Sequence, residues 1–150
     1  MDIKKFENSL IAFDFESDLV NATDMLKAFP EKKMNNFLRL EQTKNFIKVL
    51  EEKMSSFSDT LKSASNENQV LIVKKGKSNN YDQGTWMHKL LAYKFAAWLN
   101  PNFELFVYSV FDEAIKKYIQ ETKEKLESQQ RQLDYFWDKS DNEDLYYRKK

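Results

Sequence analysis

A chain of 150 residues suffices for one domain with a sizeable core, and its content of two Gly and two Pro predicts a largely helical protein with few tight turns. Because there is no Cys, the sequence excludes a disulfide framework and a thiolate metal site, and no apolar run is long enough for a membrane span. The formal net charge of zero, taken alone, argues against a nucleic-acid-binding protein.

The charges, however, are unevenly distributed along the chain. Residues 1–26 hold two Lys against six acids, residues 27–98 hold 13 Lys and Arg against seven acids, and residues 99–150 hold nine against 11. The middle of the chain is therefore basic and both ends are acidic. A basic middle suits a polyanionic partner, although charges on a solvated surface also vary without any function.

The N-terminal region predicts a β-hairpin. Leu10–Phe15 partly alternates and predicts a strand, Glu16–Asp18 forms a turn, and Leu19-Val20 begins a short return strand. Asp14 and the two acids of the turn are carboxylates of the kind that bind a divalent cation. We favour the alternative, a solvated turn.

A first helix follows the hairpin. Asn21 or Thr23 can cap its N-terminus, and Asp24 lies in the first turn, where an acid interacts favourably with the helix dipole. The pattern predicts that the helix runs to about Phe29 and that Pro30 stops it.

Two more helices are predicted next. Lys32–Leu40 has Met34, Phe37 and Leu38 on one face and polar residues on the other. Thr43–Met54 has a stripe that we expect to be buried, made of Phe46, Ile47, Leu50 and Met54.

A second hairpin is predicted in the centre of the chain. Ser55–Asn68 is rich in Ser and Asn and predicts a loop, whereas Val70–Val73 is the clearest strand pattern in the sequence. Lys74–Asn80 predicts a basic loop whose Gly can take a positive φ, and Tyr81–Met87 predicts the return strand.

Two helices complete the predicted domain. His88–Leu99 is expected to bury Met87, Leu90, Leu91, Phe95 and Trp98. Asn100-Pro101 is a cap followed by Pro at the first helical position, which is a strong start signal. The last helix is expected to continue into the charged tail up to Lys150, and to bury Phe103, Phe106, Val107, Val110, Phe111, Ala114, Ile115 and Tyr118.

Four of these segments together resemble the KilA-N domain of large DNA viruses and phages, in order and spacing. The segments are Asn21-Ala22-Thr23-Asp24, Phe37-Leu38-Arg39, Gly84-Thr85-Trp86-Met87-His88 and Trp98-Leu99-Asn100-Pro101-Asn102-Phe103. The similarity covers about residues 8–118. The sequence departs from the family pattern at three positions, because the first hairpin lacks the usual turn Gly, Phe37 stands where Trp is common, and Lys89 follows His88 where Pro is frequent.

The resemblance implies a DNA-binding fold related to fungal APSES domains, in which a helix pair and a β-hairpin wing meet DNA. We therefore expect an α+β KilA-N/APSES-like fold with an N-terminal hairpin, a helix pair, a basic hairpin wing, two packed C-terminal helices and a helical extension. The expected boundaries are 8–118 for the DNA-binding domain and 119–150 for the extension.

By position, the resemblance assigns DNA contact to the second helix and to the 74–80 hairpin. Lys side chains neutralise phosphates, Arg binds guanine bidentately, and Asn binds adenine. Lys on a helix face or loop is also often only a solubilising group. The candidate DNA-binding residues are Lys32, Lys33, Asn35, Asn36, Arg39, Lys44, Lys74, Lys75, Lys77 and Asn79.

Other chemistry has weaker support. Trp86, Trp98 and Phe103 are residue types that stack on bases, but their helical spacing beside Leu and Ala predicts core positions. His88 is the only His, so we expect it to cap or pack at a helix start.

The chain also offers little for catalysis. Glu51 and Lys53 have the spacing of the Glu-x-Lys triplet of metal-dependent nucleases, but they lie in a helical pattern instead of a strand. With no Gly-rich phosphate loop and no activated nucleophile, we expect neither an enzyme, a cofactor nor a metal.

The tail carries an incomplete heptad pattern. Ile119, Leu126 and Leu133 repeat every seven residues, and the alternate positions hold Thr122, Gln129 and Phe136. Such a segment can pair two chains weakly, dock onto its own domain or lead to a further region. Aromatic residues at 135–137 and 146–147 also need a covering surface.

The sequence thus leads to three hypotheses of function. The first is a phage, prophage or viral regulator of transcription that binds double-stranded DNA. The second is a phage antirepressor-type regulator that acts mainly on a repressor or another protein. The third, a metal-dependent nuclease, rests only on the acidic residues. The charged N-terminus resembles no signal peptide, so we expect the cytoplasm or nucleoid of a host cell.

Overall fold

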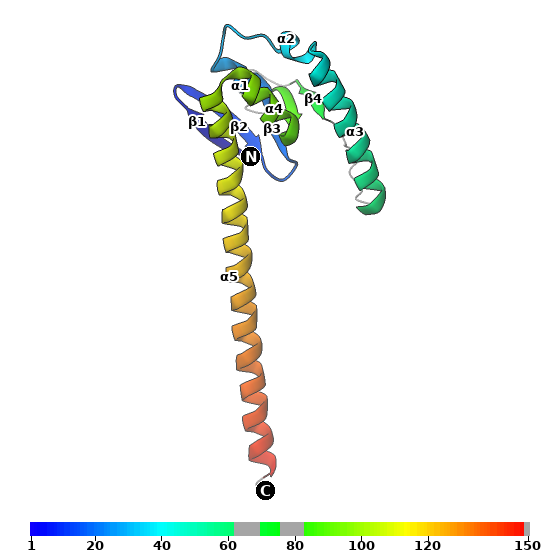
Figure 1. The fold of residues 1–150 in the computed structure, drawn as a ribbon. Helices are drawn as coiled ribbons and strands as arrows, with labels where there is room; N and C mark the ends of the chain where they lie inside the picture. The colour runs from blue at the N-terminus through cyan, green and yellow to red at the C-terminus, as the bar shows by residue number, and fades with distance from the viewer. Residues whose placement is uncertain (62–69, 76–82, 149–150) are drawn as a thin grey trace. The chain divides into compact units, whose positions relative to one another are not determined.

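The computed structural model describes residues 1–61, 70–75 and 83–148. Within these residues the chain forms five strands and five helices, which confirms the α+β class (Figure 1). In chain order the elements are β1 (Asp2–Phe6), β2 (Ser9–Asp14), β3 (Leu19–Asn21), α1 (Ala22–Lys27), α2 (Met34–Leu38), α3 (Glu41–Leu61), β4 (Leu71–Lys74), β5 (Gly84–His88), α4 (Lys89–Leu99) and α5 (Pro101–Arg148).

The five described strands form one sheet in the order β1-β2-β3-β5-β4, with every neighbouring pair antiparallel. Strand β1 was not predicted. Its sequence, DIKKF, lacks a period-two pattern because two adjacent Lys interrupt it, and it lies at the sheet edge, where only one side needs a partner. It pairs with β2 from Asp2 opposite Phe13 to Phe6 opposite Ser9.

The predicted hairpin of β2 and β3 is confirmed, and its turn shows how the chain manages without a turn Gly. Asp18 adopts a left-handed φ of 58°. Its carbonyl accepts a hydrogen bond from the Lys89 backbone N–H at 2.8 Å, and its carboxylate forms an ion pair with Lys89 Nζ at 3.2 Å. Asp tolerates the left-handed region better than most residues, and these two contacts to α4 hold it there.

Helix α1 begins at the predicted place. Asn21 is the N-cap, and its side-chain oxygen accepts a hydrogen bond from the Asp24 backbone N–H at 3.2 Å. Thr23, the other cap candidate, lies inside the helix and has a different role, described below. The helix ends at Lys27, ahead of Pro30.

The next two helices differ in length from the prediction. Helix α2 is only five residues long, Met34–Leu38, where Lys32–Leu40 was expected. Helix α3 runs to Leu61, so the prediction of a loop from Ser55 onward was wrong for Ser55–Leu61. The sequence has no Gly or Pro from 41 to 61 that would stop a helix, and Ser alone does not end one.

The second hairpin is formed by β4 and β5, with Lys74 opposite Gly84. Lys74 is therefore the last residue of strand β4, whereas the sequence predicted that it begins the loop. Residues 62–69 and 76–82, which include most of the predicted basic loop, lie outside the described residues.

Helix α4 buries a slightly different face from the one predicted. Leu90 is 41% exposed and Trp98 is only half-buried. The buried stripe includes two small residues, Ala92 and Ala96, that the prediction left out. The buried residues of α4 are Leu91, Ala92, Phe95, Ala96 and Leu99.

An aromatic cluster joins the N-terminal strand to the start of α5. The Phe103 ring lies 4.9 Å from Phe6, 5.2 Å from Phe29 and 5.8 Å from Phe106, measured between ring centroids. Phe103 is fully buried, as predicted. Asn100 caps α5 as expected, because its side-chain oxygen accepts hydrogen bonds from the backbone N–H groups of Asn102 and Phe103.

Two compact units divide the chain, Met1–Val110 and Phe111–Lys150. In the second unit Ile115 and Tyr118 are 53% and 70% exposed, so the prediction that they are buried was wrong. The described part of this unit is a single helix, which has no second layer to cover an apolar side chain. Across the described residues, no helix is both long and apolar enough to cross a membrane.

Candidate nucleic-acid interface

Helix α2 is held in place by one buried aromatic side chain. Phe37 is 1% exposed, and its ring lies 4.8 Å from Phe95 and 5.6 Å from Trp98 of α4, measured between centroids. No side chain caps its N-terminus at Lys33. A five-residue helix has almost no stability of its own, so this packing against α4 fixes its orientation.

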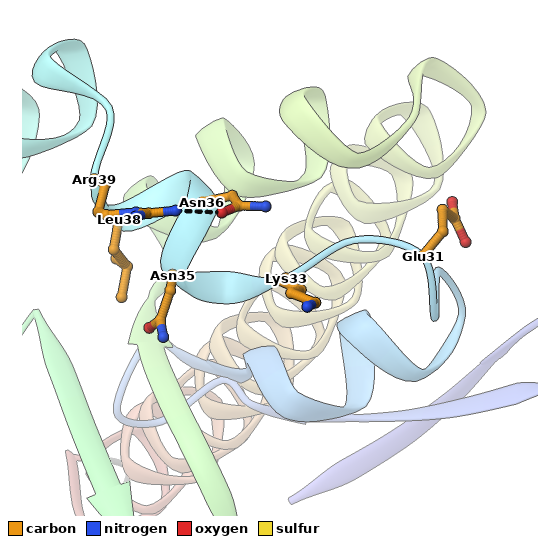
Figure 2. A pocket seen from close by; sticks show the side chains of 6 residues that line it. All are labelled: Glu31, Lys33, Asn35, Asn36, Leu38 and Arg39. Carbon is orange, nitrogen blue, oxygen red and sulfur yellow. Dashed lines mark hydrogen bonds between the residues drawn. The ribbon is translucent and has the colours of Figure 1, made fainter.

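With Phe37 inward, the polar residues of α2 point outward. Lys33, Asn35, Asn36 and Arg39 are all exposed, and we call these four residues the α2 surface. They line one open hollow of about 490 Å³ together with Glu31 and Leu38. Figure 2 shows the side chains along the Glu31–Arg39 segment, with Glu31 at the far end from Arg39.

Arg39 is partly oriented in advance. Its Nη2 atom donates a 2.7 Å hydrogen bond to Asn36 Oδ1, one turn back along the helix (Figure 2). A guanidinium held in this way keeps other N–H donors available for a phosphate or a guanine edge. The Asn36 amide nitrogen remains a donor as well. The pair therefore presents mainly hydrogen-bond donors to a ligand.

Lys33 and Asn35 have free polar ends. With the other described residues, their side chains form no hydrogen bond or ion pair, and the same holds for Lys44 on α3 and Lys75 after β4. Such lysines are available to neutralise phosphates without breaking an existing ion pair. Glu31 is the one acid among the residues that line the hollow, and its charge opposes a polyanion there.

Two candidate lysines have aromatic partners within the fold. The Lys32 ammonium lies 4.8 Å from the centroid of the Trp98 ring, and the Lys74 ammonium lies 4.6 Å from that of Trp86. Both lysines are half-buried. These cation–π contacts make them partly structural, because each ammonium group lies over a Trp ring of the fold. Lys77 and Asn79 lie outside the described residues.

The segments that carry the family resemblance are chiefly structural. Asn21 caps α1 with its oxygen and donates from its nitrogen to the Gln83 carbonyl at 2.8 Å. Thr23 Oγ1 accepts from the Thr85 backbone N–H at 2.9 Å. Asp24 Oδ2 accepts from the Ala12 backbone N–H at 3.1 Å. Together these side chains tie α1 to β2 and to the start of β5.

His88 has the structural role that was predicted. Its Nδ1 atom accepts a hydrogen bond from the Leu90 backbone N–H at 3.2 Å and so caps α4. Burial lowers the pKa of His88, the nearby Asp18 opposes this effect, and Lys89 adds to it. The neutral, accepting form of the ring is therefore favoured in the folded protein.

The carboxylates of Asp14 and Asp18, at the first turn, have separate partners within the fold. Burial alone would raise the pKa of Asp14, but hydrogen bonds from Ser17 outweigh burial and leave this pKa lowered. Asp18 is engaged by Lys89. Across the described ranges, no three His, Cys, Asp or Glu side chains gather as a metal site would require. Glu51 and Lys53 lie on α3 and not on a strand, unlike the nuclease triplet.

Two residues of the hollow were not among the sequence candidates. Leu38 was expected on the buried face, but it is half-buried and forms part of the lining. Glu31 precedes the predicted basic helix and has the wrong charge for a DNA ligand. Helix α2 is shorter than the sequence predicted, and no sequence signal indicated that either residue lines a hollow.

A comparison with protein families matches residues 4–117 to the KilA-N domain. The chain therefore belongs to the KilA-N domain family, whose members are generally DNA-binding domains and not typically enzymes. No curated protein and no solved structure matched the chain.

Proposed function

We propose that this chain binds double-stranded DNA as a transcription regulator in a phage, prophage or viral setting, in the cytoplasm or nucleoid of a host cell. The α2 surface, with Lys44, is the main contact. The hairpin of β4 and β5 is the wing, to which Lys74 and Lys75 belong. Lys77 and Asn79, which lie outside the described residues, remain candidates by their sequence position alone. The observation that supports this most strongly is the open hollow at α2, where a guanidinium, an ammonium and two amides are exposed together.

The chemistry of these groups separates two tasks. The Lys33 and Lys44 side chains contact phosphates and contribute affinity without sequence preference. Arg39 and the two Asn residues are the types that read base edges in the major groove. Lys32 and Lys74 contribute charge from fixed positions, because each is restrained above a Trp ring.

A salt series with random duplex DNA tests the proposal. If roughly five phosphates are neutralised, the logarithm of the binding constant falls with the logarithm of salt concentration with a slope of about −4 to −5. Replacing Lys33 or Lys75 by Ala makes the slope shallower by about one unit each. Lys5→Ala, on the edge strand β1, is the matched control and leaves the slope unchanged.

A substitution at Glu31 is expected to change duplex affinity in the opposite direction in the same experiment. Glu31→Gln removes the acid from the hollow with little change of shape, so duplex affinity rises at low salt and the gain disappears at high salt. Binding that does not respond to salt, or a full-length chain that ignores duplex DNA, contradicts the proposal.

The second candidate function is a phage antirepressor-type regulator that acts through a repressor or another protein. The exposed apolar side chains of α5 favour it, among them Tyr135, Phe136 and Trp137, which are 72%, 65% and 63% exposed. Under this alternative, the same salt series gives weak binding, and substitutions in the α2 surface change nothing.

A further inference from the structure

The second unit of the chain carries a regular apolar stripe. Ile115, Ile119, Leu126, Leu133 and Phe136 lie on one face of α5, separated by steps of three and four residues or their sums. These five side chains are 53%, 58%, 60%, 52% and 65% exposed. Two polar residues, Thr122 and Gln129, complete the series of positions. Steps that alternate between four and three residues are the spacing of a coiled-coil seam.

We infer that this stripe pairs with the same stripe of a second copy of the chain, as a parallel, in-register, two-stranded coiled coil. Ile119, Leu126 and Leu133 are then a positions, and Ile115, Thr122, Gln129 and Phe136 are d positions. Each a residue packs against the same residue of the second copy, and so does each d residue.

Thr122 enters such a seam at little cost. Its hydroxyl donates a 2.8 Å hydrogen bond to the Tyr118 carbonyl of its own helix. The polar atom is thus already satisfied, and the methyl group is available for packing. A buried hydroxyl is costly only when it lacks a hydrogen-bond partner.

Gln129 selects the orientation of the pair. Its amide forms no hydrogen bond with any other described residue. In a parallel, in-register pair it meets Gln129 of the second copy, where one amide donates to the other. An antiparallel pair sets each d residue against an a residue, so Gln129 would face Ile119, Leu126 or Leu133 and remain unsatisfied. A single polar residue in a seam specifies register in this way.

The charges beside the seam are compatible with this pairing. From Ile119 to Asp138 every acid lies at an outward position, namely Glu121, Glu124, Glu127, Asp134 and Asp138. The flanking pairs between parallel copies join Tyr118 to Lys123, Lys125 to Gln130 and Gln132 to Trp137. None of these pairs brings two like charges together, so nothing in the flanks opposes association.

A parallel pair has a consequence for the proposed function. Both helices run in the same direction, so both DNA-binding domains precede the same end of the pair and can engage one duplex together. The pairing itself does not depend on DNA binding. It is therefore measured without DNA, and its failure is distinct from failure of the DNA proposal.

Sedimentation equilibrium of the full chain is the first test. We expect a reversible dimer, and we expect Leu126→Ala to raise the dimer dissociation constant at least about a hundredfold, because two packed Leu side chains are truncated. Glu127→Ala, one residue along on the outward face, is the control and keeps the wild-type constant. Thermal unfolding of the N-terminal domain checks that every variant is folded. A monomer at all concentrations, a trimer, or a dimer unaffected by Leu126→Ala overturns the inference.

Disulfide trapping tests the orientation, and the absence of native Cys makes its background clean. An equimolar mixture of Thr122→Cys and Leu133→Cys chains is oxidised, and its cross-linked peptides are identified by mass spectrometry. A parallel, in-register pair gives only disulfides between identical positions. An antiparallel pair that overlaps fully joins position 122 to position 133. Mixed disulfides as the main product therefore overturn the parallel arrangement. Glu124→Cys, on the outward face, is the control and is expected to give no disulfide-linked dimer.

Discussion

Gly84 has a φ of +125°, a conformation that side-chain-bearing residues rarely adopt. It begins β5 at the point where Asn21 and Thr23 reach across from α1. A Cβ atom at this position would lie 2.8 Å from Thr23 Oγ1 and 2.9 Å from Asn21 Oδ1. The close approach leaves no room for a side chain at position 84 beside Asn21 and Thr23.

The first prediction concerns this joint. Gly84→Ala lowers the free energy of unfolding by about 1–3 kcal/mol, because Ala is strained at this φ and the side chains of Asn21 and Thr23 must move. Urea denaturation measures the loss. Ala97→Gly, on the exposed side of α4, is a control that costs only about 1 kcal/mol through helix propensity. A Gly84→Ala protein as stable as wild type would show that the joint is not closely packed.

The second prediction concerns His88 and pH. Burial lowers the pKa of His88 below its ordinary value of 6.5, so the unfolded chain binds the proton more readily than the folded protein. The contribution of His88 to stability is therefore complete above pH 6.5 and is lost as the pH falls below it. Protonation also removes the lone pair on Nδ1 that caps α4.

Urea midpoints at pH about 7.5 and about 5.5 check this prediction. The wild-type protein loses stability on acidification, and His88→Asn, which retains a capping oxygen but cannot titrate, loses less. If both proteins respond equally, other groups control the pH dependence.

At the scale of elements, the two hairpins and the capped helix starts followed from local sequence. Asn21 and Asn100 cap their helices as predicted, because a cap depends only on residues within one turn. Strand β1 and the short length of α2 did not follow. The edge strand pairs with the adjacent β2, but its own sequence has no alternating pattern to predict it. Helix α2 depends on the contacts of Phe37 with Phe95 and Trp98, which are distant in sequence.

For the candidate site, too, the sequence predicted local features and missed those that depend on tertiary contacts. The residue types of the α2 surface and their outward direction followed from helical spacing. The cation–π contacts of Lys32 and Lys74, and the position of Glu31 in the hollow, depend on tertiary packing. Sequence periodicity carries no information on either.

The third prediction separates two aromatic residues that sequence reasoning grouped together. Phe103→Ala costs about 3–5 kcal/mol of stability, because Phe103 is fully buried between Phe6, Phe29 and Phe106. Trp98→Ala costs less, because Trp98 is only half-buried, but it removes the support of Phe37 and Lys32.

The two variants are therefore expected to differ in how far their loss of duplex affinity exceeds their loss of stability. Trp98→Ala weakens DNA binding by more than its loss of stability explains, whereas any weakening in Phe103→Ala follows from unfolding alone. Urea denaturation and duplex affinity, measured on the same samples, distinguish them. If the ratio of affinity loss to stability loss is the same in both variants, Trp98 does not support the DNA contact through Phe37 and Lys32.

At the scale of the whole molecule, a zero net charge conceals an uneven distribution of charge, from which we expect DNA contact and self-association to lie in different parts of the chain. The excess of Lys and Arg lies in residues 27–98, which include α2, α3 and the second hairpin, and the acids dominate at both ends. After residue 118 the chain holds seven Lys and Arg against eight acids, so this part of the chain offers phosphate no net attraction. Its exposed apolar stripe suits a protein partner instead.

The fourth prediction tests this division. A chain cut after Tyr118 remains folded, because the first compact unit ends at Val110 and retains its share of α5. It keeps its DNA affinity per domain and loses self-association, as measured by duplex titration and sedimentation. A cut chain that is folded, yet has lost DNA binding at every protein concentration, would assign the extension to the DNA site.

Amide chemical-shift mapping of the labelled full-length chain, titrated with a random duplex, tests the central claim most directly. We expect the largest shifts in the stretch from Lys32 to Lys44 and around Lys74-Lys75, which diminish together as salt is added. Signals from 119–138 stay in place. Shifts concentrated in α5 or in β1, with the α2 surface unchanged at saturating DNA, would contradict the assignment of the α2 surface as the DNA contact.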